Sequence, residues 1–416
     1  MSRKPTASLV PAVIDAFFED STFLWAKSPA GSVTVGGGIT FVTGPSGCGK
    51  STLLREVMET DSTWLTLPDM RPGVALIDHL TGSLGERMSM LARFGLGDAQ
   101  VVIRDHDGLS DGQRFRARLA LAFAVGATRI IVDEFLSTVD ATTAKVVAHN
   151  VQRLCRARGV DLLAATTHDE IETALMPDRT IVMRSNSEPE VRERSGPMEG
   201  SIRNDISIGS GTIAEFELLQ RFHYYPALDF DPDQRDVSIV IARYREQPIA
   251  ARLYCAPYPA AWASDLPLLA DINDELTLGQ RLVVDPMFRG LGLARAVCSP
   301  VHAPLETIYT RSVMSRYTDL HYSLGYQRHE PLTNKLDALR SGDLRKDVLR
   351  VLVTEFADYR SVLSRPIRDN EATIVARWFA RHVASLSPAQ LELSAKSTRM
   401  GGYVARKGRG SLDGNR

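Results

Sequence analysis

Apolar positions recur with two different periods along the chain. From residue 39 to about residue 183, short β-branched and aliphatic runs alternate with longer stretches in which apolar residues follow the helical period. This alternation is typical of a mainly parallel α/β sheet. The predicted strands are Ile39–Thr43, Arg129–Val132, Asp161–Thr167 and Thr180–Met183, and the predicted helices are Lys50–Glu59, Gly112–Val125 and Ala141–Arg158.

The pattern changes in the second half of the chain. Residues 185–211 are rich in Ser, Gly, Glu and Arg with little apolar periodicity, which predicts a linker. A second α/β-like pattern follows, with a hairpin of Val237–Tyr244 and Ile249–Tyr254, a strand Arg281–Val284 and a helix from Gly292. We therefore predict a domain over residues 1–188, a linker over 189–212, a second domain over 213–335 and a helical, charged region over 336–416.

Composition excludes several classes of protein. The chain has 416 residues, of which 44% are hydrophobic, so it has core material for two to three domains. Its 49 basic and 50 acidic residues nearly cancel, so no global field attracts nucleic acid or a membrane. The longest apolar run, Leu119–Ala127, is shorter than the roughly 18 residues of a membrane span. The four widely spaced cysteines predict reduced thiols and a cytoplasmic location.

The end of the chain is the one segment with an uneven charge. Its several basic residues are balanced by only two acidic ones, Glu392 and Asp413. We interpret this segment as a solvated tail, with a nucleic-acid contact as the alternative. The basic residues are Lys396, Arg399, Arg406, Lys407, Arg409 and Arg416.

A glycine-rich segment joins the first predicted strand to the helix behind it. Residues 44–51 fit the pattern G-x-x-x-x-G-K-[ST] of phosphate-binding loops. Glycines let backbone N–H groups curl around a phosphate, and the helix start adds its positive dipole end. Lys50 is expected to reach the β- and γ-phosphates of a nucleotide, and Ser51 to ligate Mg²⁺. The expected nucleotide contacts are Gly44, Pro45, Ser46, Gly47, Cys48, Gly49, Lys50, Ser51 and Thr52.

Two carboxylates end the predicted strand Arg129–Val132. An apolar strand that ends in acids delivers them to the edge where nucleotides bind in α/β sheets. Asp133 is expected to hold Mg²⁺ through water, and Glu134 to polarise the attacking water.

Three further motifs make the interpretation specific. Leu109-Ser110-Asp111-Gly112-Gln113 opens a helix before Asp133, Asp140 follows the acid pair, and His168 ends the strand that starts at Asp161. In this order the chain resembles the ATP-binding-cassette (ABC) ATPases, with their phosphate loop, LSGGQ-type signature, Asp-Glu pair, D-loop and switch histidine. The expected activity is ATP hydrolysis.

The resemblance implies a mechanism and a partner. In that family two cassettes close head to tail over two ATP molecules, which implies a homodimer here. Ser110, Gly112 and Gln113 would then meet the γ-phosphate held by the other subunit, at a helix start suited to an anion. His168 would contact the γ-phosphate, and Asp140 would lie across the dimer seam.

The chain departs from the ABC pattern in three ways. Asp111 replaces the middle glycine of the signature, so like-charge repulsion would weaken closure unless its carboxylate points away or meets a cation. The interval from Ser51 to Ser110 is short, which implies a reduced helical subdomain. No Q-loop glutamine is evident, and Asp78 stands in its approximate place. The adenine-stacking aromatic is unassigned among Phe18, Phe23 and Trp25.

A second glycine-rich turn follows the strand Arg281–Val284. Its sequence from Arg289 to Ala294 resembles the R-x-x-G-x-[GA] loop of GNAT-type N-acetyltransferases, with Arg289, Gly290, Gly292 and Ala294 at the positions that would contact acetyl-CoA. The segment 322–326 resembles a late GNAT motif, although its alignment places His321 at the general-acid position, with Tyr322 adjacent. A degenerate GNAT module that binds without turnover is the alternative.

The combination resembles a prokaryotic and phage family of ABC-type ATPases fused to a predicted acetyltransferase. The expected fold is an α/β ABC-type P-loop domain, then a GNAT-like α+β domain and a helical C-terminal appendix. The first functional hypothesis is an ATPase that uses ATP and Mg²⁺ and is coupled to acetyl transfer from acetyl-CoA to an amine. The alternative is a nucleic-acid-associated ATP switch with a non-catalytic GNAT-like module. A transporter cassette fits less well because of the short helical region and the missing Q-loop.

Overall fold

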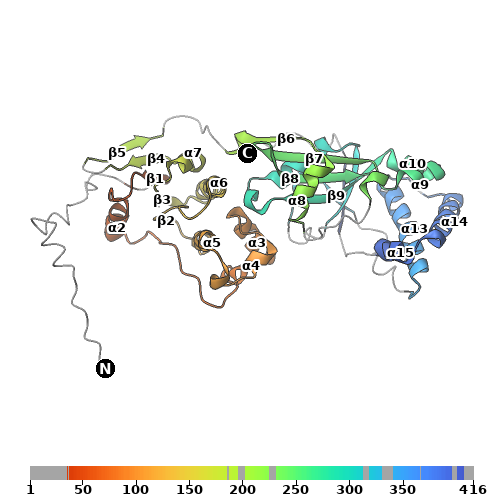
Figure 1. The fold of residues 1–416 in the computed structure, drawn as a ribbon, viewed down its shortest axis with the longest axis horizontal. Helices are drawn as coiled ribbons and strands as arrows, with labels where there is room; N and C mark the ends of the chain where they lie inside the picture. The colour runs from red at the N-terminus through yellow and green to blue at the C-terminus, as the bar shows by residue number, and fades with distance from the viewer. Residues whose placement is uncertain are drawn as a thin grey trace, which may run out of the picture.

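A computed structural model describes residues 35, 37–184, 187–194, 202–223, 231–312, 318–329, 341–365, 367–395 and 401–406. The described residues form two separate sheets that lie side by side along the long axis of the molecule (Figure 1). The first sheet contains the phosphate-loop motif, and the second contains the GNAT-like motifs. Among the described residues, no helix combines the length and the apolarity needed to cross a membrane.

The first sheet has the strand order β2-β3-β1-β4-β5. Neighbouring strands from β2 to β4 pair in parallel, and β5 is antiparallel at the edge. This confirms the prediction of a mainly parallel sheet, and each of its four predicted strands lies within two residues of an observed one. The strands are β1 (Ile39–Thr43), β2 (Arg129–Val132), β3 (Asp161–Ala165), β4 (Arg179–Val182) and β5 (Glu190–Glu193).

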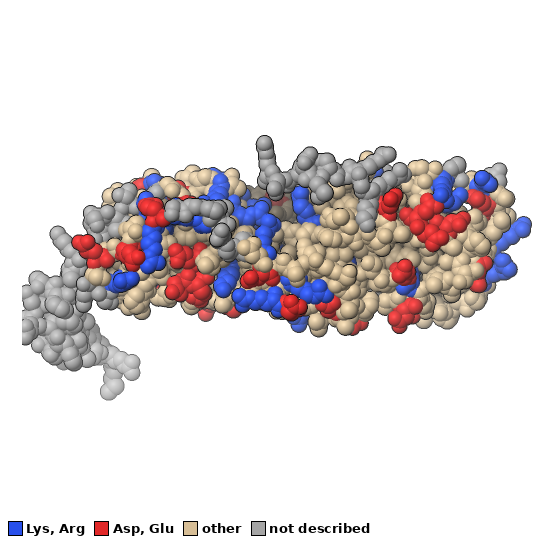
Figure 2. All heavy atoms as spheres, turned by 90° about the horizontal axis from the view of Figure 1, so that it is seen from above, with Lys and Arg blue, Asp and Glu red and all other residues tan. Residues whose placement is uncertain are grey.

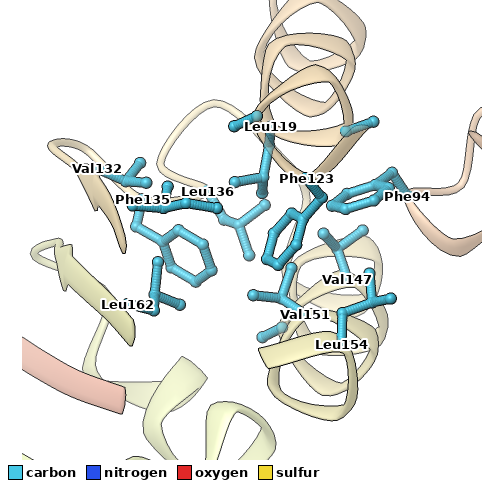
Figure 3. Close-up of a cluster of buried hydrophobic side chains, with 14 of the residues drawn as sticks. Phe94, Leu119, Phe123, Val132, Phe135, Leu136, Val147, Val151, Leu154 and Leu162 are labelled. Atoms are coloured by element: carbon cyan, nitrogen blue, oxygen red, sulfur yellow. The ribbon is translucent and has the colours of Figure 1, made fainter. Parts of the chain in front are cut away.

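Helices cover both faces of this sheet. Helix α2 (Lys50–Thr60) packs on one face through Leu53 and Leu54. Helices α5 (Asp111–Ala124) and α6 (Ala141–Arg158) pack on the other. Their apolar residues recur at helical spacing, as in Leu119 and Phe123, and point toward the sheet and one another (Figure 3). Because these apolar residues of α5 and α6 are buried against the sheet, the first residues of both helices lie near one edge of the sheet.

A small group of helices fills the interval between α2 and α5. It contains α3 (Leu84–Arg93) and the single turn α4 (Ala99–Val102). Helix α3 begins with a capping box, in which Ser83 and Glu86 satisfy each other's backbone N–H groups. Phe94, directly after α3, lies against Phe123 of α5 with a ring separation of 5.8 Å. The short helix α7 (Glu172–Leu175) follows β3.

The second sheet has the strand order β11-β12-β10-β9-β8-β7-β6. All its neighbours pair antiparallel except β9 and β10, which run parallel in its middle. Its strands are β6 (Ile206–Ser210), β7 (Val237–Tyr244), β8 (Gln247–Cys255), β9 (Leu276–Val284), β10 (Thr307–Ser312), β11 (Gln327–His329) and β12 (Gly401–Arg406). Its helices are α8 (Ile213–Gln220), α9 (Ala260–Asp265), α10 (Pro267–Asn273), α11 (Leu293–Val297), α13 (Leu344–Val362), α14 (Asp369–Ser385) and α15 (Pro388–Ala395).

Two features differ from the sequence prediction. The segment predicted as a linker supplies the edge strands β5 and β6, one for each sheet. The segment predicted as a solvated tail contains β12, which pairs with both β10 and β11. Every residue of β5 is exposed, so it has no apolar alternation to detect. The other basic tail residues, Lys396, Arg399, Lys407, Arg409 and Arg416, lie outside the described residues.

Candidate functional site

The phosphate-loop motif follows β1 at the carboxyl edge of the first sheet. Gly44 adopts φ +143°, and a Cβ there would lie 2.1 Å from the carbonyl oxygen of Met183. Gly47 and Gly49 have φ +80° and +96°, a region that other residues rarely adopt. The loop therefore needs glycine both for its turns and for its close packing on the end of β4.

The start of helix α2 is open to an anion. Gly49 is its N-cap, and no side chain caps the first turn. The N–H groups of a helix start have no intrahelical partners and carry a positive partial charge. Ser46 and Ser51 are exposed here, while Cys48 and Thr52 are partly exposed. This arrangement can hold a phosphate group on backbone N–H donors.

Lys50 lies inside the loop. Its side chain is buried, and its Nζ donates to the carbonyl oxygens of Gly44 at 2.8 Å and Pro45 at 2.9 Å. A buried ammonium needs such partners because desolvation is costly. Phosphate oxygens offer stronger, charge-assisted bonds to the same ammonium.

The acid pair and the histidine motif meet the phosphate loop at one edge, because β3 lies between β1 and β2. The N–H of Thr166 donates to Val42 at 3.0 Å, and the N–H of Phe135 donates to Ala165 at 2.7 Å. These bonds tie together the segments that follow three neighbouring strands. Asp133 is exposed at this edge and is available to a cation.

Glu134 is exposed and held in an uncommon backbone conformation. Its φ is +52°, a value sparsely populated by residues other than glycine. Its N–H donates to the Asp133 carboxylate at 2.9 Å, and the Ser137 hydroxyl donates to its carbonyl at 3.0 Å. Phe135, fully buried next to it, anchors the turn. Strain of this kind persists where the surroundings fix the conformation, and it concentrates at functional sites.

His168 follows β3 and is partly exposed. Its Nδ1 lies 3.2 Å from Oε1 of Glu170, and its backbone N–H donates to the Thr166 hydroxyl. The pKa of Glu170 is lowered, first by its own backbone N–H and then by the histidine, which outweigh partial burial. The carboxylate therefore stays ionised and orients the imidazole.

The signature segment caps helix α5. Ser110 accepts from the N–H of Gln113, whose side chain accepts from the N–H of Ser110. Asp111 forms an ion pair with Arg114 on the same helix, so the carboxylate that replaces the usual glycine meets a cation. A Cβ on Gly112 would lie 2.9 Å from the carbonyl oxygen of Thr138, so glycine is needed for this approach.

Arg116 connects the signature helix to the helical subdomain, a role that sequence reasoning missed. Its guanidinium donates to the carbonyls of Gly112 at 3.1 Å and of Phe94 and Gly95 at 3.0 Å each. Asp140 caps α6 by accepting from Thr143. Partial burial opposes ionisation of Asp140, but these backbone bonds and Arg116 outweigh it and lower its pKa.

The site fits a Mg²⁺ ion shared with phosphates. Among the described residues, no group of three or more His, Cys, Asp or Glu side chains could hold a metal. Mg²⁺ usually takes one or two protein ligands and keeps waters and substrate phosphates, so Ser51 and Asp133 suit it. Asp78 is exposed beside Arg87 at 3.7 Å, away from this set of contacts. The adenine candidates Phe18, Phe23 and Trp25 lie outside the described residues.

The second glycine-rich loop contacts the first domain. The guanidinium of Arg289 donates to the carbonyl of Gly97, between α3 and α5, instead of standing free for an anion. The Asn150 side chain on α6 donates to the Arg289 carbonyl at 3.0 Å, and Arg203 donates to the Leu291 carbonyl at 2.6 Å. Gly290 and Gly292 remain exposed, and Ala294 belongs to the five-residue helix α11. Arg289 is therefore unsuited, in this arrangement, to a coenzyme A pyrophosphate.

His321 is buried in the second domain. Burial, and then the charge of Arg252, lower its pKa to about 4. An imidazole that is neutral at physiological pH is a poor general acid. Tyr322 beside it is half exposed.

Sequence comparison matches a third or more of the chain to ATP-binding proteins of importers. The chain is 31% identical over 171 residues to the aliphatic sulfonates import ATP-binding protein SsuB of Burkholderia thailandensis, covering 36% of this chain and 51% of that protein. It is 32% identical to the spermidine/putrescine import ATP-binding protein PotA of Aliivibrio fischeri, covering 34% of this chain and 47% of that protein. The chain thus spans about half the length of these curated relatives. No family model matches it.

Among solved structures, the fold is similar to the dimeric post-hydrolysis state of the ATP-binding cassette MJ0796 bound to ADP and Pi. That match has a TM-score of 0.33 at 17% identity and covers 39% of this chain and 89% of that chain. The ADP conformation of the cassette MJ1267 gives a TM-score of 0.30 at 17% identity, covering 39% and 82%. The sequence relatives support an ABC-type ATP-binding domain in the part of the chain that they match.

Proposed function

We propose that this chain binds ATP with Mg²⁺ and hydrolyses it as a head-to-tail homodimer. The observation that carries the proposal is the common edge at which Lys50, Glu134 and His168 follow three adjacent parallel strands. Nucleotides bind in α/β sheets at this edge. The importer relatives, which are ATP-binding proteins by name, support the same activity.

Each residue has a role that its surroundings suit. Lys50 exchanges its two loop carbonyls for phosphate oxygens, and the open start of α2 donates backbone N–H groups. Ser51 and Asp133 would hold Mg²⁺, which neutralises charge on the phosphates. Glu134 accepts a hydrogen bond from the attacking water, and His168 senses the γ-phosphate.

The signature segment would complete the site of the other subunit. Ser110 and Gly112 lie at the start of the 14-residue helix α5, where the dipole favours an anion. The Asp111–Arg114 pair offsets the negative charge that would otherwise repel ATP. Asp140, the N-cap of α6, lies in the segment that follows Thr138, which packs against Gly112.

The second domain, in this proposal, is a GNAT-like module that transmits or receives the movement of the ATPase domain without acetyl transfer. The GNAT-like resemblance rests on the motif from Arg289 to Ala294 and on the upstream hairpin, which the described structure contains as β7 and β8. The engagement of Arg289 with Gly97 and the burial of His321 favour the non-catalytic alternative. Release of free coenzyme A from acetyl-CoA in the presence of an amine acceptor would reject it.

The substitution Glu134→Gln tests the ATPase proposal. The amide keeps the shape of the side chain but cannot take a proton from water, so hydrolysis should fall at least about 100-fold. ATP binding should persist, and light scattering should detect a dimer with ATP that the wild type forms only transiently. The exposed Glu217→Gln on α8 makes the same chemical change elsewhere and should leave turnover unchanged. Normal turnover in Glu134→Gln would refute the assignment.

A further inference from the structure

One face of helix α6 contacts residues of both domains where the domains join. Val146 packs against Ile202 in the core of the second domain. One turn later, the Asn150 side chain donates to the carbonyl of Arg93 at 2.8 Å. Residues three or four positions apart share a helix face, so Arg153 continues this face into solvent. Its charge acts on Arg93, at the end of α3, and on Arg203, in the turn Ile202–Asp205.

Exposed arginines from three elements gather around this point. The arginine patch consists of Arg93 on α3, Arg153 and Arg158 on α6, and Arg203 in the turn Ile202–Asp205. Burial of its stem, and then the charges of Arg158 and Arg153, lower the pKa of Arg93. Burial, and then the charge of Arg153, also lower the pKa of Arg203. Arg153 therefore repels both Arg93 and Arg203, and an anion bound among these arginines would relieve that repulsion.

Two of the four patch arginines have no hydrogen-bond or ion-pair partner within the described residues, whereas Arg203 donates to the Leu291 carbonyl. In the part of the chain that the structure describes, the side chains of Arg93 and Arg153 form no ion pair or hydrogen bond. Within the described part of the chain, Arg158 donates only to the carbonyl of Phe123, at 2.9 Å. The nearby Asp205 lies 3.6 Å from Arg245.

Helix α6 also carries a buried histidine on which the charges of two patch arginines act. His149 is 3% exposed, and neither of its ring nitrogens has a hydrogen-bond partner within the described residues. Burial, and then the charges of Arg203 across the junction and of Arg153 one turn further along α6, lower its pKa to about 4.

We propose that the arginine patch binds the phosphate backbone of a nucleic acid. Guanidinium groups bind phosphate oxygens in bidentate geometry, and arginines on three separate elements suit a series of phosphates more than one small anion. Figure 2 shows basic side chains near the middle of the drawn face, with acidic side chains among them.

The patch is separate from the nucleotide site. Arg153 lies thirteen residues beyond Asp140 on the same helix, about 20 Å along its axis at the usual rise. Because Asp140 is the N-cap of α6 and the other end of this helix carries Arg153 and Arg158, a bound nucleic acid would contact the helix that reaches the proposed dimer seam. ATP binding and nucleic-acid binding can therefore be measured, and can fail, independently.

Fluorescence anisotropy of the full chain tests the proposal. The probes are a labelled DNA duplex and a labelled single-stranded RNA, each about 30 nucleotides long, titrated over a series of salt concentrations. The double variant Arg93→Gln/Arg153→Gln should weaken binding about tenfold or more near 0.1 M salt and reduce the log–log salt slope by about two. Arg377→Gln/Arg381→Gln, which removes two exposed arginines from α14, is the matched control and should bind like the wild type.

Two further measurements separate charge from folding and nucleic acid from other polyanions. Arg93→Lys/Arg153→Lys retains the charges and should keep most of the salt slope. Equal affinity and slope in wild type and Arg93→Gln/Arg153→Gln would overturn the proposal. Competition by polyglutamate as effective as that by unlabelled nucleic acid would also overturn it, in favour of an acidic protein partner.

Discussion

At the scale of single residues, His149 shows how the fold controls a charge. Burial, and then the charges of Arg203 and Arg153, lower its pKa from an ordinary value of 6.5 to about 4. Between these values the unfolded chain binds a proton that the folded chain does not. Folding stability therefore decreases as the pH falls from about 6.5 toward 4, and the full loss is reached below both values.

We predict that His149→Gln removes part of this pH dependence. The amide cannot be protonated, so the free energy of unfolding of the variant should change by about 1–3 kcal/mol less than that of the wild type between pH 7 and pH 4.5. Urea denaturation at the two pH values measures the difference. The same change at the exposed His302 should leave the wild-type dependence intact. Equal slopes for His149→Gln and the wild type would show that the buried imidazole does not control this transition.

Local motifs allowed much of the candidate site to be predicted from sequence. The phosphate loop, the acid pair and the signature are runs of neighbouring residues, so their chemistry can be recognised before the fold is known. Arg116 and Asn150 could not be found this way, because Arg116 contacts a carbonyl 22 positions away and Asn150 one 57 positions away. The ion pair of Asp111 with Arg114, three residues apart on one helix, lay within reach of sequence reasoning.

At the scale of elements, the loop from Arg289 to Gly292 joins the two domains. The Arg289 side chain donates to the Gly97 carbonyl. The carbonyls of Arg289 and Leu291 accept from the side chains of Asn150 and Arg203, respectively. Gly97 lies beyond Phe94 and Gly95, which accept from Arg116 of the signature helix. A continuous series of contacts therefore runs from the signature segment to the second domain.

Arg289→Ala should loosen this contact. The variant leaves the Gly97 carbonyl without its charged donor, and we predict at least about tenfold faster amide hydrogen exchange in residues 93–98 and 286–292. Hydrogen exchange read by mass spectrometry measures this directly. Arg295→Ala, on α11 with a single long bond to Ser323 at 3.4 Å, is the control. Unchanged exchange in Arg289→Ala would mean that the domains are held by other contacts.

Elements with a buried face were predictable, and exposed or glycine-rich ones were not. Strand β1 is buried at every position, and its predicted bounds match the observed ones. Strand β5 is exposed throughout, and β12 begins with two glycines, so neither has a detectable apolar pattern. Whether such a segment forms a strand depends on pairing with strands that are distant in the sequence.

At the scale of the whole molecule, the chain joins an ATP-binding domain to a second sheet. The last described strand of the chain, β12, belongs to this second sheet. β12 pairs with β10 and β11, so the segment that ends this sheet comes after the helices α13 to α15. The pattern of hydropathy along the chain does not reveal that a segment so distant in sequence joins this sheet. It also means that a deletion reaching β12 would remove part of the sheet along with basic residues.

The central claim is that two chains build each ATP site together, with the phosphate loop of one and the signature of the other. Mixing Lys50→Ala with Ser110→Arg tests it most directly, because each variant alone lacks one part of every site. A head-to-tail heterodimer of the two contains one intact site, so we predict that two individually inactive proteins recover about a quarter of wild-type ATPase activity when mixed. A mixture as inactive as its components, with both variants folded, would contradict the account.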